Sequence, residues 1–269
     1  MRPEGWIRCL LGLVLIATAA GCSRVTFLRP DVSRGDYRRV APEVSIRPDR
    51  KSGAINPVRA AEARLLSGDA SGALQAAERA LAIDDRSAEA HSVAALSLDA
   101  LKRPREAGAH HRRAAELAPG QGSLLNNYGA WLCANGRPAE AAGWFDRALA
   151  APGYASPDAA LANAGACALR SGDLERAAAS LRRAIEIAPA NPLALRTLAE
   201  VELRRGRAFE ARAFIERRLA AAPADEESLL LASQIEQELG DTAAAARYVR
   251  RIRAEFPRTP DSAREGGNP

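Results

Sequence analysis

The sequence predicts an all-α protein, a solenoid built from six repeats of two antiparallel helices. Turn residues recur at spacings of 34, 34, 36, 34 and 34 residues, and an alanine follows each of them by five residues. A third residue, most often proline, closes each unit in the same phase, and no segment alternates as a strand would. The turn residues are Gly68, Lys102, Gly136, Gly172, Gly206 and Gly240.

A period of 34 residues is that of the tetratricopeptide repeat, a helix–turn–helix unit. One such unit cannot bury its apolar face alone, so stacked units share a continuous core. We therefore expect one solenoid over residues 54–259. Its predicted units are Ala54–Ser87, Ala88–Gln121, Gly122–Pro157, Asp158–Asn191, Pro192–Asp225 and Glu226–Thr259.

Each unit carries a small residue where its first helix must cross its second. Glycine is expected there in the third and fourth units, at Gly129 and Gly165, and serine in the sixth, at Ser233. Alanine holds this place in the other three units. The closing prolines Pro119, Pro189, Pro223 and Pro257 cannot continue a helix, because proline lacks the backbone N–H.

The N-terminus has the pattern of an export signal over residues 1–21. Arg2 and Arg8 supply positive charge, and the apolar run that follows is too short to span a bilayer. The sequence Ala19-Ala20-Gly21-Cys22 resembles a bacterial lipobox, which predicts lipidation of Cys22. Ser23 after it, by resemblance to Gram-negative lipoproteins, implies release to the outer membrane, with the protein facing the periplasm. The alternative is an ordinary signal peptide in which Cys22 is incidental.

Charge is distributed unevenly along the chain. Residues 22–53, which contain three prolines and little periodicity, carry a net charge of +4 and are expected to be a flexible tether. The basic residues there suit either contact with anionic lipid or simple solvation. Residues 54–269 have a net charge of zero, which disfavours a nucleic-acid partner, and 260–269 are expected to be a disordered tail.

Four cysteines are present, and two of them remain available for pairing. Cys9 leaves with the signal and Cys22 is acylated, which leaves Cys133 and Cys167 in an oxidising compartment. They lie in the first helices of neighbouring units, so we predict a disulfide between them. The alternative is two separate buried thiols, a common state of cysteine.

No catalytic constellation is visible in the sequence. The three histidines, His91, His110 and His111, lack metal-ligand spacing, and the glycines follow the repeat period rather than forming a phosphate loop. We expect no enzyme activity, no cofactor, no metal and no small-molecule substrate. The expected partner is a protein.

The third unit holds an unusual share of the aromatic residues, five of twelve. Tyr128, Trp144 and Phe145 are expected to pack the core. Polar residues on first helices of such repeats often line the concave groove and bind an extended peptide. The candidate partner-binding residues are Asn126, Trp131, Asn163 and Arg196.

The run Leu125-Asn126-Asn127-Tyr128-Gly129-Ala130-Trp131-Leu132-Cys133 resembles the signature of the type IV pilus biogenesis/stability lipoproteins, the PilW (PilF) family. Residues 162–169, which include Asn163, Gly165 and Cys167, are similar to the matching run of the next repeat. The resemblance covers Cys22 and roughly residues 54–257, and it is least close in the first two units.

The resemblance implies a pilotin-like assembly factor, held in the outer membrane by its lipid anchor. Such a protein helps the pilus secretin to localise or multimerise, or binds other type IV pilus assembly proteins. The alternative is a tetratricopeptide-repeat lipoprotein that serves as a scaffold for another envelope machine, such as a tight-adherence pilus or an outer-membrane assembly complex.

Overall fold

The computed structural model describes residues 57–257, and this part of the chain is entirely helical. The described residues belong to one compact unit. None of their helices is both long and apolar enough to cross a membrane. The twelve helices are α1 (Pro57–Leu66), α2 (Ala70–Ile83), α3 (Ala88–Ala100), α4 (Pro104–Leu117), α5 (Gly122–Ala134), α6 (Pro138–Ala150), α7 (Pro157–Arg170), α8 (Leu174–Ile187), α9 (Pro192–Arg204), α10 (Ala208–Ala221), α11 (Glu226–Glu238) and α12 (Thr242–Glu255).

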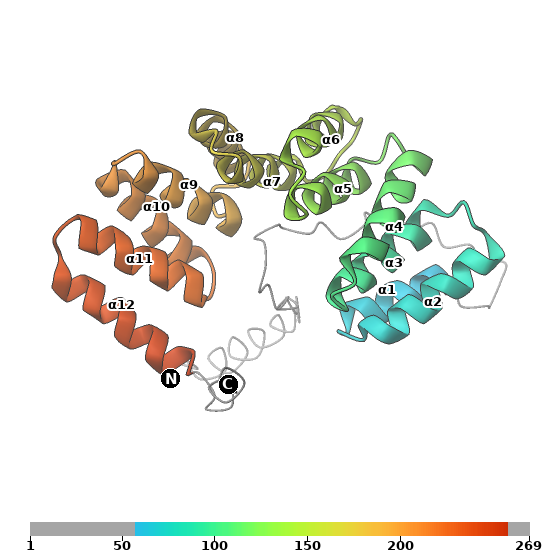
Figure 1. Cartoon of the computed structure of the whole chain (residues 1–269), viewed down its shortest axis with the longest axis horizontal. Helices are drawn as coiled ribbons and strands as arrows, with labels where there is room; N and C mark the ends of the chain where they lie inside the picture. Colours follow the sequence, from blue (N-terminus) through green and yellow to red (C-terminus); the bar gives the residue numbers. More distant parts are fainter. Residues whose placement is uncertain (1–56, 258–269) are drawn as a thin grey trace, which may run out of the picture. The chain divides into compact units, whose positions relative to one another are not determined.

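The helices form six successive pairs, α1 with α2 through α11 with α12, which confirms the predicted solenoid of paired helices (Figure 1). The second helix of each of the first five pairs packs on the first helix of the next pair. First helices also contact one another across successive pairs, as α5 does with α7 and α7 with α9. The array is therefore held together by contacts between neighbouring pairs, as expected of a repeat solenoid.

A residue with left-handed backbone lies in the turn that joins the two helices of each pair. Five of the six predicted turn residues are glycines with φ between 74° and 85°, a region that glycine enters without steric cost. Lys102 takes the same place in the second pair with φ 60°, and it is the only described non-glycine residue with positive φ. The turn geometry is thus common to all six pairs, and one pair adopts it with a strained residue.

Prolines begin helices as well as following them. Pro104, Pro138, Pro157 and Pro192 each occupy the first turn of a helix, where a missing N–H costs nothing. Asp69, Asp173 and Asp241 accept a hydrogen bond at the start of the second helix in the first, fourth and sixth pairs. The repeat pattern alone predicts only the closing role of proline.

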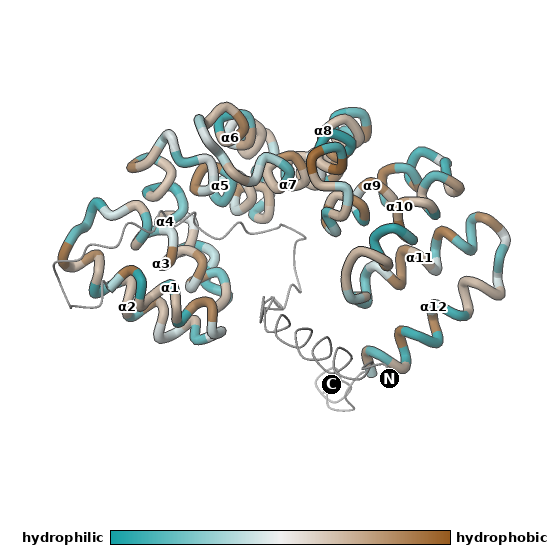
Figure 2. The backbone as a smooth tube through the Cα atoms, turned by 180° about the vertical axis from the view of Figure 1, so that it is seen from behind, coloured by the Kyte–Doolittle hydropathy of each residue, from teal (hydrophilic) through white to brown (hydrophobic). Residues whose placement is uncertain are grey.

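The core lies where the two helices of each pair cross. A Cβ atom at Gly129 would lie 2.9 Å from the Phe145 ring, and one at Gly165 would lie 2.5 Å from Leu181. The small residues are therefore required by the packing of α5 on α6 and of α7 on α8. Figure 2 shows apolar and polar positions alternating along the helices, as expected when one face of each helix is buried.

Several predictions lie outside the described residues. These are the signal at residues 1–21, the lipidation of Cys22, the tether up to residue 53 and the tail from residue 260. They remain predictions.

Candidate functional site

A disulfide joins the first helices of the third and fourth pairs. Cys133 on α5 and Cys167 on α7 have sulfur atoms 2.01 Å apart and Cα atoms 5.8 Å apart. Both residues are buried. The bridge spans 34 residues of sequence, so it fixes one pair against the next. We refer to the four helices α5 to α8 as the braced segment.

Two buried amides make a second link between α5 and α7. The Asn163 side-chain nitrogen Nδ2 donates to Asn126 Oδ1 at 3.0 Å, and neither side chain is exposed. The Asn126 Nδ2 atom is buried without a hydrogen-bond partner among the described residues. Because both amides are fully buried, they connect helices in this structure and do not present polar groups to a groove.

Trp131 connects the braced segment to the preceding pair. Its indole Nε1 donates to the Pro104 carbonyl oxygen at 3.1 Å. The indole ring also covers Gly108 of α4, where a Cβ atom would lie only 2.1 Å from the ring. Glycine at position 108 therefore creates the space that the tryptophan fills.

Around Trp131 lies an aromatic cluster made of Tyr128, Trp131 and Trp144. Tyr128 stacks on Trp131 with ring centroids 6.1 Å apart and meets Trp144 edge to face at 4.8 Å. The Arg147 guanidinium lies 4.1 Å from the centroid of the Trp144 ring. Tyr128 and Phe145 are buried core residues, and Trp144 is partly buried against the same core.

Arg196 on α9 is almost fully buried and faces α11, where its guanidinium lies 3.8 Å from the Glu227 carboxylate. The four candidate partner-binding residues thus occupy three different interfaces between helix pairs. The structure brings Asn126 and Asn163 together and places Trp131 and Arg196 elsewhere. Binding of a partner by these residues stays a prediction.

Sequence analysis missed a group of buried charges between the fourth, fifth and sixth pairs. Glu202 on α9 is 1% exposed and accepts from Arg182 of α8 at 2.8 Å. The guanidinium groups of Arg205 and Arg207 also face it. Glu236, at the same place on α11, pairs with Arg212 of α10. The available signal was a glutamate three residues after the small crossing residue in both units.

The histidines gather in the second pair. His91 Nδ1 and His110 Nδ1 are 2.9 Å apart, and His111 Nε2 is 2.9 Å from the partly buried Asp99 carboxylate. Burial lowers the pKa of His110, and the nearby His91 and His111 lower it further. Within residues 57–257, no group of three or more histidine, cysteine or acidic side chains is arranged to hold a metal ion.

The comparisons with known proteins agree with this architecture. A tetratricopeptide-repeat family model matches residues 168–235. The crystal structure of PilW, described as a widely conserved type IV pilus biogenesis factor, is 30% identical with a TM-score of 0.70, and the match covers 76% of this chain and 94% of that one. This chain belongs to the PilW family.

Two further structures share the fold of the PilW family. Pseudomonas aeruginosa PilF is 22% identical with a TM-score of 0.66, over 76% of this chain and 91% of that one. A thermophilic tetratricopeptide-repeat protein of Thermus thermophilus is 22% identical with a TM-score of 0.55, over 68% of this chain and 97% of that one. No curated protein matches the sequence. A tetratricopeptide-repeat scaffold is typical of proteins that bind other proteins and do not catalyse reactions.

Proposed function

We propose that this protein is a pilotin-like assembly factor of the type IV pilus, a lipoprotein of the outer membrane that binds a periplasmic partner such as the secretin. The observation that carries the proposal is the match to PilW, because it extends over nearly the whole of that biogenesis factor at 30% identity. The identity of the partner and the attachment to the outer membrane are proposals. They rest on the family and on the lipobox at Cys22.

The braced segment suits a binding platform. Its first helices are joined by the Cys133–Cys167 bridge and by the Asn126–Asn163 hydrogen bond. A platform that is already rigid loses little conformational entropy when a partner binds, so more of its contact energy appears as affinity. We propose that Asn126 and Asn163 act by holding the platform, since neither reaches the surface.

The proposal is tested by deleting the gene and measuring surface pili and twitching motility. We expect both to be lost and to return when the wild-type gene is supplied. Cys22→Ser should restore them poorly, because stable membrane anchoring needs more than one acyl chain, and the variant should appear in the soluble periplasmic fraction. Normal piliation in the deletion strain would contradict the proposal.

Partner binding is tested separately with purified protein and the periplasmic part of the secretin. Arg196→Ala should weaken capture by about 1–3 kcal/mol, because an arginine that contributes to an interface is a typical hot spot. Glu227→Ala is the matched control, because it removes the same ion pair while leaving the arginine in place. Equal binding by the wild type and Arg196→Ala, with both folded by circular dichroism, would move the interface away from α9.

A further inference from the structure

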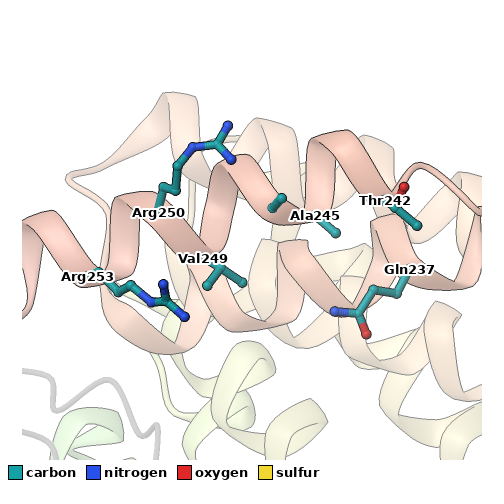
Figure 3. Close-up of a pocket in the computed structure, with 7 residues that line it drawn as sticks. Gln237, Thr242, Ala245, Val249, Arg250 and Arg253 are labelled. Carbon is teal, nitrogen blue, oxygen red and sulfur yellow. The ribbon is translucent and has the colours of Figure 1, made fainter.

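In each of the first five helix pairs, one face of the second helix is covered by the next pair. Within residues 57–257, the equivalent face of the sixth pair is open. From α2 to α10, each second helix packs on the first helix of the next pair. On α12 no helix of the described residues follows. The open face is lined by one residue of α11 and six residues of α12 (Figure 3). We call it the terminal face, and its residues are Gln237, Thr242, Ala245, Ala246, Val249, Arg250 and Arg253.

The apolar part of the terminal face repeats an internal packing position. Val249 follows Ser233 by 16 residues, as Leu181 follows Gly165 and as Ile215 follows Ala199. Leu181 and Ile215 are 0% and 1% exposed, whereas Val249 is only partly buried. The terminal face therefore lacks part of the cover that the equivalent positions receive inside the array.

The charged part of the terminal face repeats an internal ion pair. Arg250 follows Ser233 by 17 residues, as Arg182 follows Gly165. Arg182 is paired with Glu202, which the covering helix α9 supplies three residues after its own crossing residue. Neither Arg250 nor Arg253 has an acidic partner within residues 57–257.

We propose that the terminal face binds an amphipathic α-helix of a partner protein, which carries a carboxylate beside its apolar stripe. A helix is the expected form, because helices cover every equivalent face within this chain. The carboxylate is expected opposite Arg250, where the internal interface places Glu202 against Arg182. This is recognition of a helix in a groove, with an ion pair that fixes its register.

A second copy of this chain fits the terminal face poorly. In a head-to-tail stack, α1 of the next copy would be the covering helix. Its residue three positions after Ala61 is Arg64, where α9 and α11 have glutamates. Arg64, which is already paired with Asp69, would bring a second guanidinium to Arg250 where the internal interface has a carboxylate, so the ion pair would not form.

Residues 258–269 of the chain itself also fit the terminal face poorly. Residues 258–269 read RTPDSAREGGNP, with three glycines or prolines among the final four and a single alanine as the apolar residue. This sequence offers no apolar stripe at helical spacing to cover Val249. A heterologous helix remains the occupant that matches both the shape and the charge of the terminal face.

The inference deepens the proposed function by naming the kind of segment that a partner would offer. Its test uses a peptide with purified protein, so it can fail while the pilus assays succeed, or the reverse. The probe is the α9 sequence PLALRTLAEVELR (192–204), whose Glu202 pairs with Arg182 inside the array, fluorescently labelled and stapled on its exposed side. The staple is needed because a helix this short is marginal alone. Binding to the full-length exported protein is followed by fluorescence anisotropy.

Saturable binding is expected for the wild type, and Arg250→Glu should weaken it by roughly tenfold or more. Arg247→Glu is the matched control on the same helix, because Arg247 is exposed and outside the terminal face. A peptide with Glu202→Arg should bind the Arg250→Glu variant better than it binds the wild type. Absence of saturable binding, or equal loss in both protein variants, would overturn the inference.

Two further measurements identify other occupants, and either would also overturn the inference. The first compares sedimentation of the wild type and Arg250→Glu: self-association that the substitution abolishes would assign the terminal face to a second copy. Removal of residues 258–269 is the other measurement. A large gain in peptide affinity on removal would assign the face to the chain's own tail.

Discussion

The third and fourth helix pairs and the fifth and sixth pairs share one geometry and hold it by different chemistry. The braced segment uses a disulfide and a buried amide pair between α5 and α7, and aromatic packing between α5 and α6. The interfaces that join the fourth, fifth and sixth pairs use arginine–glutamate pairs, in which Glu202 and Glu236 are almost fully buried. The small residues and turns set the arrangement of helices, and the contacts that join neighbouring pairs are free to vary.

The difference has a consequence for where the array can be loosened. A disulfide stabilises the fold by lowering the conformational entropy of the unfolded chain. A buried ion pair offsets the cost of desolvating its two charges only while both partners are present. Loss of one partner of an arginine–glutamate pair should therefore destabilise the C-terminal pairs. Reduction of the disulfide should destabilise the braced segment. The following variants separate these two effects.

The largest effect is expected from the disulfide. Changing both cysteines, Cys133→Ser with Cys167→Ser, should lower the free energy of unfolding by about 3–4 kcal/mol, because the bridge closes a loop of 34 residues. Urea denaturation of the oxidised wild type and the double variant measures this. Dithiothreitol should destabilise the wild type and leave the double variant unchanged. Equal stability of the oxidised wild type and the double variant would show that the disulfide does not stabilise the array.

Glu202→Ala should destabilise the array by about 3 kcal/mol, because it removes a buried carboxylate that Arg182, Arg205 and Arg207 share, and among the described residues only Arg205 keeps a second ion pair, with Glu175. The expected loss is at the lower end of the range for buried pairs, since Arg182 and Arg207 can turn to water. Glu200→Ala is the control on the same helix, where the ion pair with Arg204 is more exposed. Urea denaturation should show almost no change for the control, and equal losses in the two variants would contradict a buried-charge interface.

Gly108→Ala should cost about 1–3 kcal/mol, because the added methyl group overlaps the Trp131 indole and must displace it. Tryptophan fluorescence should shift to longer wavelength as the ring becomes exposed. Gly143→Ala on α6 is the control: nothing lies within 4 Å of its Cβ position, and alanine favours a helix. An unchanged fluorescence maximum in Gly108→Ala would refute the wedge role of Trp131.

The smallest effect is expected at the turn of the second pair. Lys102→Gly should stabilise the protein by about 0.5–1 kcal/mol, because glycine adopts φ 60° without the strain that a side chain imposes. Lys102→Ala keeps the strain and should give no gain. Thermal unfolding of the two variants decides the point, and a loss of stability with glycine would show that the lysine side chain contributes more than its backbone costs.

The sequence was sufficient to predict the architecture but not the contacts of individual polar side chains. Repeat spacing and the crossing residues Gly129 and Gly165 depend on helix geometry, which is local and periodic. The sequence predicts a groove position for Asn126 and Arg196, because polar residues on first helices often face a groove. Their burial depends on which neighbour supplies a partner, Asn163 in one case and Glu227 in the other, and periodicity alone does not contain that information.

The buried glutamates were missed for a related reason. A glutamate on a helix usually faces solvent, so Glu202 and Glu236 gave no sign of burial when each was considered alone. The signal of their burial is that each lies three residues after a crossing residue, Ala199 or Ser233. Comparison of equivalent positions across units identifies such residues, and it also relates Arg250 to Arg182.

The most direct test of the central claim, a role in type IV pilus assembly, is the amount of multimeric secretin in outer membranes of a deletion strain. Multimers are measured by immunoblot of membranes from the wild type, the deletion strain and the strain complemented with the wild-type gene or with Cys22→Ser. We predict that multimers are lost on deletion, restored by the wild type and poorly restored by Cys22→Ser. Normal amounts of secretin multimer in the outer membrane of the deletion strain would contradict the account.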